Sequence, residues 1–174
     1  MFAFGAYSVI IRFKGGNVVK VIFLDIDGVL NSRAYDRKRD WTKQTDIDET
    51  RLPLVKRIVE ETGAEIVLSS TWRRHWDKNA EACAEDGRYI NEIFAKYGLK
   101  IYDKTPYLGI CAERKDEVAL WLERAGDAVE KFVIIDDYRY GWAELYDFFV
   151  KTNPNLGAGL EEEHVVKAIE ILNG

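Results

Sequence analysis

The sequence contains few of the residues that bind zinc or form the disulfide bonds of small secreted domains. It has two cysteines, Cys83 and Cys111, which form no CxxC pair, and two histidines, His75 and His164. This scarcity argues against a zinc site and against a disulfide scaffold. Since unpaired cysteines are typical of compartments that keep thiols reduced, it also predicts a cytoplasmic protein.

Long hydrophobic runs are lacking as well. No stretch of eighteen apolar residues occurs, so we expect no segment to cross a membrane. The start of the chain, MFAFGAYSVIIRF, is apolar, but it lacks a basic leading region, and Arg12 interrupts it before any cleavage-like site. We therefore interpret it as a strand and not as a signal peptide.

The sequence also lacks an overall excess of positive charge. The net charge is −5, which argues against a basic nucleic-acid clamp over the whole chain. Residues 31–44 differ from the rest, with five lysines and arginines against two aspartates. Such a run fits a solvated surface loop as well as a site for a polyanion, and composition does not choose between them.

The hydrophobic residues that are present predict an α/β fold. The chain has 174 residues, 47% of them hydrophobic, which is enough for one core. Near-continuous apolar strands are predicted at 18–24, 64–70, 99–105 and 131–136, and amphipathic helices at 48–63, 88–98, 113–126 and 161–172. This alternation indicates a three-layer, doubly wound and mostly parallel sheet that helices cover on both faces.

A hairpin is predicted at the N-terminus. Residues 7–13 and 18–24 flank the sequence KGGN, whose glycines permit a tight turn. We therefore place residues 1–19 in a hairpin extension and residues 20–174 in the main domain.

Polar residues stand where three of the predicted strands end. The first strand is followed by Asp25, Asp27 and Gly28, the second by Ser69 and Ser70, and the last by Asp136 and Asp137, while Arg114 and Lys115 open the helix before the last strand. Singly, these are common turn, capping and surface residues. Because open parallel sheets bind ligands at the carboxyl ends of their strands, we expect the whole set to meet at one edge.

The pair Asp25 and Asp27 raises a question of its own. Two carboxylates at the end of a buried strand repel each other and lose hydration, which is costly. A divalent cation would offset that cost.

The ordered set of motifs resembles the haloacid dehalogenase (HAD) superfamily of phosphohydrolases. The likeness rests on DxDG after the first core strand, a serine after the next, a basic residue before the last, and a final acidic pair. In finer detail, FLDIDGVLNS, IVLSSTWR, R114-x-x-E-V-x-x-W-L and VIIDD resemble the HAD domain of "Swiss Army knife" RNA-repair proteins and of related small phage and bacterial phosphatases. The resemblance runs from about residue 20 to the C-terminus.

The resemblance implies a Mg²⁺-dependent phosphatase that forms an aspartyl-phosphate. Asp25 would be the nucleophile and a metal ligand. Asp27 would act as general acid and then as general base, and its backbone carbonyl would bind the metal. One residue of the final pair completes the metal site; the family pattern favours Asp137, with Asp136 close by. Gly28 would let the chain turn near the metal.

The resemblance also implies roles for the serines and the basic residues. Ser69 would bind a phosphoryl oxygen, with Ser70 as its alternative one residue on. Arg114, or its neighbour Lys115, would take the basic position where most relatives have lysine. At that position arginine offers phosphate a planar fork, whereas lysine offers a point charge.

The substrate is left open by the sequence. The two connections from Gly28 to Ala64 and from Thr71 to Glu113 are too short to hold a large cap beside their core elements. An open site would admit RNA or DNA ends, and the basic loop 33–43 with Arg73, Arg74, Trp72 and Trp76 would then offer a platform for phosphates and bases. Core packing is the alternative role for the tryptophans.

Two other functions remain as alternatives. One is a capless phosphatase of small metabolites or phosphoproteins. The other is a receiver-like signalling domain, which we disfavour because no lone aspartate ends a strand between residues 27 and 69. The expected partner is a phosphorylated substrate and not a membrane, and the oligomeric state is left open.

Overall fold

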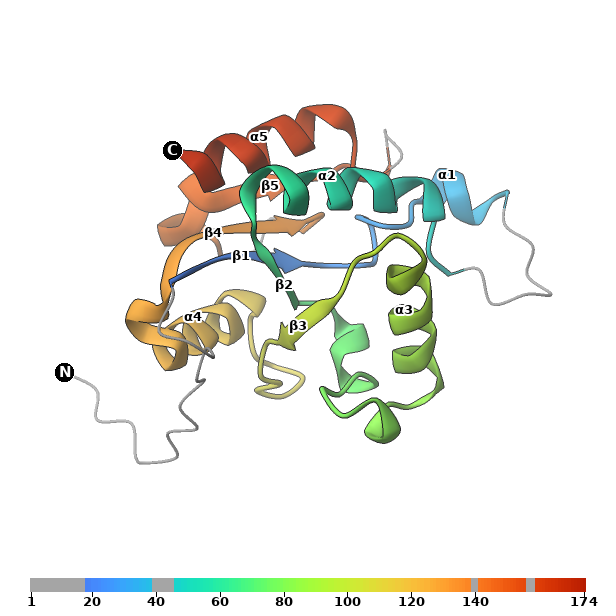
Figure 1. Ribbon diagram of the computed structural model, residues 1–174, viewed down its shortest axis with the longest axis horizontal. Coiled ribbons are helices and arrows are strands. Elements are labelled where there is room, and N and C mark those ends of the chain that lie inside the picture. Colours follow the sequence, from blue (N-terminus) through green and yellow to red (C-terminus); the bar gives the residue numbers. More distant parts are fainter. Residues whose placement is uncertain (1–17, 39–45, 139–140, 156–158) are drawn as a thin grey trace.

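A five-stranded parallel sheet forms the middle layer of the fold (Figure 1). The computed structural model describes residues 18–38, 46–138, 141–155 and 159–174. Its strands are β1 (Val19–Leu24), β2 (Glu65–Leu68), β3 (Ile101–Lys104), β4 (Val129–Asp136) and β5 (Phe149–Lys151). Their order across the sheet is β3-β2-β1-β4-β5, and every neighbouring pair is parallel.

Helices connect the strands and cover both faces of the sheet. The α-helices are α1 (Arg33–Asp36), α2 (Leu52–Thr62), α3 (Glu85–Lys96), α4 (Arg114–Ala125) and α5 (Glu162–Asn173). Short 3-10 helices are η1 (Glu49–Arg51), η2 (Thr71–Arg74), η3 (Ala80–Ala82), η4 (Gly126–Ala128) and η5 (Ala143–Phe148). No described helix is long and apolar enough to cross a membrane.

The alternation of side chains along β1 explains the two covered faces. Ile22 and Leu24 are fully buried in a cluster with residues of α2, α3 and α5. Val21 and Phe23 point the other way, into a second cluster with Val118 and Trp121 of α4. Since successive side chains of a strand face opposite sides, a strand this apolar requires cover on both. Figure 1 shows α2 and α5 on one side of the sheet and α4 on the other. The predicted three-layer parallel architecture is confirmed.

The helix boundaries follow local sequence signals. Pro53 lies in the first turn of α2, where its missing N–H costs no hydrogen bond, and Gly63 ends the helix at a φ of 70°. The other predicted helices begin and end within a few residues of α3, α4 and α5. The edge strand β5 was not predicted, because three residues are too few to show a periodic pattern.

Several expectations concern the ends and insertions of the chain. The predicted strand at 7–13 lies outside the described residues, and β1 has β2 and β4 on its two sides. In the described parts of the connections that follow β1 and β2, the inserted elements are α1, η1, η2 and η3, with no separate cap domain. Cys83 is buried and Cys111 exposed, and both are free.

Candidate active site at the carboxyl edge of the sheet

The sheet register continues one residue past the strand ends and aligns the predicted site. The Asp25 N–H donates to the Ile135 carbonyl at 3.0 Å, and the Ser69 N–H donates to the Leu24 carbonyl at 2.8 Å. Since Leu24 pairs with both Ile135 and Leu68, these bonds put Asp25 between Asp136 and Ser69. Three strand-end groups that lie far apart in the sequence thus become neighbours.

Three carboxylates gather at this edge. One oxygen each of Asp25, Asp136 and Asp137 lies within 4.8 Å of the others. Asp25 is 6% exposed and Asp136 3%, whereas Asp137 is half-buried. Carboxylate oxygens are the ligands that Mg²⁺ prefers, and that ion needs only a few of them beside water and substrate. The donor set therefore fits a Mg²⁺ ion.

The electrostatics of the three carboxylates are unfavourable without a cation. Burial raises the pKa of Asp25 to about 6, against a lowering effect of Arg114. Burial and then the charge of Asp25 raise the pKa of Asp136 to about 8. Burial also raises the pKa of Asp137. Each shift means that the folded protein holds the negative charge at a cost, which a bound divalent cation would offset.

Arg114 is the basic residue that faces the carboxylates. Its Nη1 lies 3.5 Å from Asp25 Oδ1 and 3.8 Å from Asp136 Oδ2. The same nitrogen is buried and has no hydrogen-bond partner among the described residues, so a donor is left for a ligand. Lys115 instead pairs with Glu113 at 3.1 Å. Of these two neighbours, Arg114 is therefore the one that faces the carboxylates.

Gly28 brings the backbone against the final acidic pair. Its φ is +79°, in the left-handed region, and an added Cβ would lie 2.5 Å from Asp137 Oδ2. Its carbonyl accepts from the Thr152 hydroxyl at 2.9 Å, which ties the turn to the end of β5. Only glycine fits here without moving Asp137.

Asp27 lies apart from the three carboxylates. Its side chain is exposed, and both oxygens accept hydrogen bonds: Oδ2 from Trp72 Nε1 at 3.0 Å and Oδ1 from Asn31 Nδ2 at 3.0 Å. Asp27 is not in the group of carboxylates that could share an ion. Our sequence reasoning missed Asn31, although its place in the FLDIDGVLNS motif was a signal that could have found it.

The two serines have different surroundings. Ser69 Oγ is buried and has no hydrogen-bond partner within the described part of the chain. The Ser70 side chain hydrogen-bonds the Asp25 carboxylate, which lowers the pKa of Asp25. Ser70 Oγ also accepts from the Trp72 N–H at 3.4 Å and so caps η2. Ser69 thus has a free donor, while Ser70 contacts the expected nucleophile.

Arg73 is held inside the protein. Its guanidinium forms a buried ion pair with Glu117 of α4 and donates to the Ser70 carbonyl at 2.6 Å. It also lies 5.8 Å from the centre of the Tyr107 ring, and Arg74 lies 4.9 Å from it. Arg73 therefore links η2 to α4, and the neighbouring Arg74 is the exposed member of the pair.

The site opens into one broad cleft. Its volume is about 890 Å³, and it is lined by the three carboxylates and, on its walls, by Trp72, Arg74, Tyr107, Ile110 and Arg33. Trp76 does not line it: that ring is buried in the core and donates to Asn91 at 2.8 Å. Of the predicted basic loop, Arg37 and Lys38 are exposed, and residues 39–43 lie outside the described residues.

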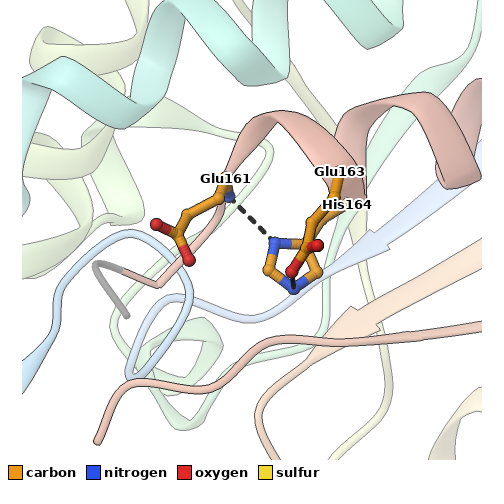
Figure 2. A group of neighbouring side chains, drawn as sticks. All are labelled: Glu161, Glu163 and His164. Atoms are coloured by element: carbon orange, nitrogen blue, oxygen red, sulfur yellow. Dashed lines mark hydrogen bonds and ion pairs between the residues drawn. The ribbon is translucent and has the colours of Figure 1, made fainter. Parts of the chain in front are cut away.

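A second group of possible metal ligands is explained by helix capping. Glu161, Glu163 and His164 stand at the start of α5 (Figure 2). His164 Nδ1 accepts the Glu161 N–H at 3.0 Å, and the Glu161 side chain accepts a backbone N–H in return. The positive end of the helix dipole disfavours a cation there. We therefore assign these residues to the cap.

One comparison with known proteins gives a match. A family model described as the HAD domain in Swiss Army Knife RNA repair proteins matches residues 21–165. This span holds every strand end of the site, the Arg114 position and the two residues that bind Asp27. No curated protein and no solved structure matches the chain.

Proposed function

The chain belongs to the family of HAD domains found in Swiss Army Knife RNA repair proteins, and from that premise we propose that it is a phosphatase with Asp25 as its nucleophile. HAD domains are generally hydrolases, and most of these act on phosphate esters. The observation that carries the proposal is the position of Asp25, buried at the end of the central strand between Asp136 and Ser69 and facing Arg114.

The chemistry would proceed in two balanced halves. First, an Asp25 oxygen bonds to phosphorus while the bond from phosphorus to the ester oxygen breaks, and protonated Asp27 gives its proton to that oxygen. Then Asp27 takes a proton from a water molecule as the water oxygen bonds to phosphorus and the Asp25–phosphorus bond breaks. The products are an alcohol and inorganic phosphate, and Asp25 is regenerated.

The remaining site residues would neutralise charge and orient the phosphoryl group. Asp25, Asp136 and Asp137, with the backbone carbonyl of Asp27, would hold Mg²⁺. The bound ion would neutralise negative charge on the phosphoryl oxygens. Arg114 keeps a free donor beside Asp25, and the unpartnered Ser69 hydroxyl would donate to a phosphoryl oxygen.

We propose nucleic-acid ends or nucleotides as substrates. The cleft is open and has no described cap, and Arg33, Arg74, Trp72 and Tyr107 are among the residues that line it. Guanidinium groups and aromatic faces are the groups that bind the backbone and bases of single strands. Acidic residues also line the cleft, among them Asp36, Asp46 and Glu113, which favours small phosphorylated metabolites as the alternative.

Hydrolysis of 4-nitrophenyl phosphate tests the reaction. The wild-type protein should hydrolyse it with Mg²⁺ and stop when EDTA is added, and Asp25→Asn should be inactive while its thermal unfolding stays cooperative. Asp127→Asn is the matched control, because Asp127 is an exposed aspartate in η4, away from the cleft. Turnover by Asp25→Asn, or in EDTA, would contradict the mechanism.

A substrate series tests the preference for nucleic acid. Oligonucleotides with 3′- or 5′-phosphates should show a higher kcat/KM than 4-nitrophenyl phosphate. Replacing Arg37 and Lys38 together by alanine should lower kcat/KM for oligonucleotides alone, with a loss that shrinks as salt rises. Replacing the exposed Lys96 and Lys100 removes the same charge far from the cleft and serves as the control. If replacing either pair of basic residues had the same effect on kcat/KM for oligonucleotides, the small-metabolite alternative would be favoured.

A further inference from the structure

Asp27 is the most exposed of the four site aspartates, yet both of its side-chain oxygens accept hydrogen bonds. One oxygen accepts from Trp72 in η2 and the other from Asn31 in the connection after β1, each at 3.0 Å. An exposed aspartate normally samples several rotamers, and fixing one costs entropy. Two side-chain hydrogen bonds, one to each oxygen, restrict the carboxyl group of Asp27 to one rotamer.

Trp72 contributes the first bond from a well-anchored ring. It lies in η2, directly after β2, and its partly buried ring packs against the main hydrophobic cluster. The indole N–H can only donate. It therefore orients the Asp27 carboxylate without competing for the proton that Asp27 would transfer.

Asn31 contributes the second bond from the opposite side. Its Oδ1 accepts the Gly28 N–H at 2.8 Å, and its Nδ2 donates to Asp27 Oδ1 and to the Asp46 carbonyl at 3.1 Å. Besides its bond to Asp27, the amide is thus fixed by two contacts, one with Gly28 in the same turn and one with Asp46 outside it. Because the Asn31 side chain is itself fixed, its hydrogen bond can fix the orientation of the Asp27 carboxyl group.

We propose that Trp72 and Asn31 are positioning residues that keep the Asp27 carboxylate in the cleft, ready for proton transfer, and away from the three carboxylates that would bind the cation. The proposal rests on the proposed function, because it assumes that Asp27 is the acid and base. Of the four aspartate side chains, three would then bind the cation and that of Asp27 would transfer a proton. Without the two donors, the Asp27 side chain would rotate freely between several rotamers.

The test uses substrates that differ in their need for an acid. Aryl phosphates with leaving groups of increasing pKa depend more and more on proton donation. Trp72→Phe keeps the ring and removes the donor, so the loss of kcat should be about tenfold or more greater for phenyl phosphate than for 4-nitrophenyl phosphate. Asn31→Asp keeps an acceptor for the Gly28 N–H but removes the donor, and should show the same pattern.

A double-mutant cycle shows whether Trp72 acts through Asp27. Asp27→Asn alone should give the larger leaving-group-dependent loss, and adding Trp72→Phe should cost no more, since the group that it positions is gone. The Mg²⁺-dependent rise in the melting temperature (Tm) should persist in every variant, because the three other carboxylates are unchanged. Trp121→Phe is the control: Trp121 Nε1 donates to Asp103 at 3.0 Å, the same type of pair, on the buried face of α4.

The outcomes separate this inference from the proposed function. An equal loss on all substrates, an effect that adds to that of Asp27→Asn, or no loss at all would overturn the positioning role while leaving the phosphatase in place. A wild-type protein that hydrolyses none of the phosphates would overturn the proposed function, and the positioning role with it.

Discussion

Replacing Asp136 by asparagine should stabilise the protein in the absence of divalent cations. In this variant one of three clustered carboxylates loses its charge, while the asparagine Oδ1 can still accept the Tyr138 N–H that now lies 2.8 Å from Asp136 Oδ1. The side chains have nearly the same size, so packing should not change. Active-site groups are often destabilising in this way.

The magnitude follows from the distances. Asp136 has oxygens within 4.8 Å of those of Asp25 and Asp137, and at an effective dielectric constant of about 20 each repulsion is worth about 3.5 kcal/mol. Arg114 lies 3.8 Å away and returns about 4.4 kcal/mol of attraction on the same scale. The net cost of the Asp136 charge is therefore about 2–3 kcal/mol. For a chain of 174 residues, this corresponds to a rise in Tm of about 5–10 °C.

Thermal unfolding followed by circular dichroism at pH 8.5 measures the effect, because that pH lies above the raised pKa of Asp136, about 8. In EDTA, Asp136→Asn should melt above the wild type. Mg²⁺ at about ten times its dissociation constant should stabilise the wild type by about 1.4 kcal/mol and the variant by much less. Asp127→Asn should match the wild type in both buffers. A variant that melts below the wild type in EDTA, or a wild type indifferent to Mg²⁺, would refute the reasoning.

Two further predictions concern the same edge of the sheet. In EDTA, the Tm of the wild type should fall as the pH rises from about 4 to about 8. The pKa values of Asp25 and Asp136 in the folded protein, about 6 and about 8, lie above the ordinary 3.8. Across this pH range the folded protein therefore binds more protons than the unfolded chain, and raising the pH destabilises it. A pH series of melts checks this, and a rising Tm would contradict it. Gly28→Ala should abolish the Mg²⁺-dependent rise in Tm, because the added Cβ would displace Asp137. Gly63→Ala is the control: Gly63 has a similar positive φ, but an added Cβ would meet no atom within 4 Å. This control should lose about 1 kcal/mol of stability and keep the Mg²⁺-dependent rise.

Local patterns were enough to predict the framework of the site. The apolar run before Asp25 and the apolar run before Asp136 each indicated a buried strand, and strands of this kind pair in parallel when helices separate them. The rule that ligands bind at the carboxyl ends of such strands then placed the aspartates and the serines at one edge. In the structure, Asp25, Ser69 and Asp136 lie side by side at that edge.

Contacts between distant residues were beyond the reach of those patterns. Trp72 donates to Asp27 across 45 positions of sequence, and Arg73 pairs with Glu117 across 44. No periodic signal marks such pairs. The ion pair that buries Arg73 was therefore not predicted, and of the two roles that the sequence left open for Trp76 the structure shows core packing.

The sequence by itself determined which strands are buried and which residues follow them, because hydrophobic runs and glycine turns act over a few neighbouring positions. Only the tertiary structure decided which of those residues face one another. Arg114 and Lys115 are adjacent in the chain, yet successive residues of a helix point about 100° apart, so one reaches Asp25 and the other pairs with Glu113. Likewise, the folding of η2 onto the turn after β1 set Asp27 apart from the three carboxylates. Side-chain direction depends on how whole elements pack, and that packing is a property of the complete fold.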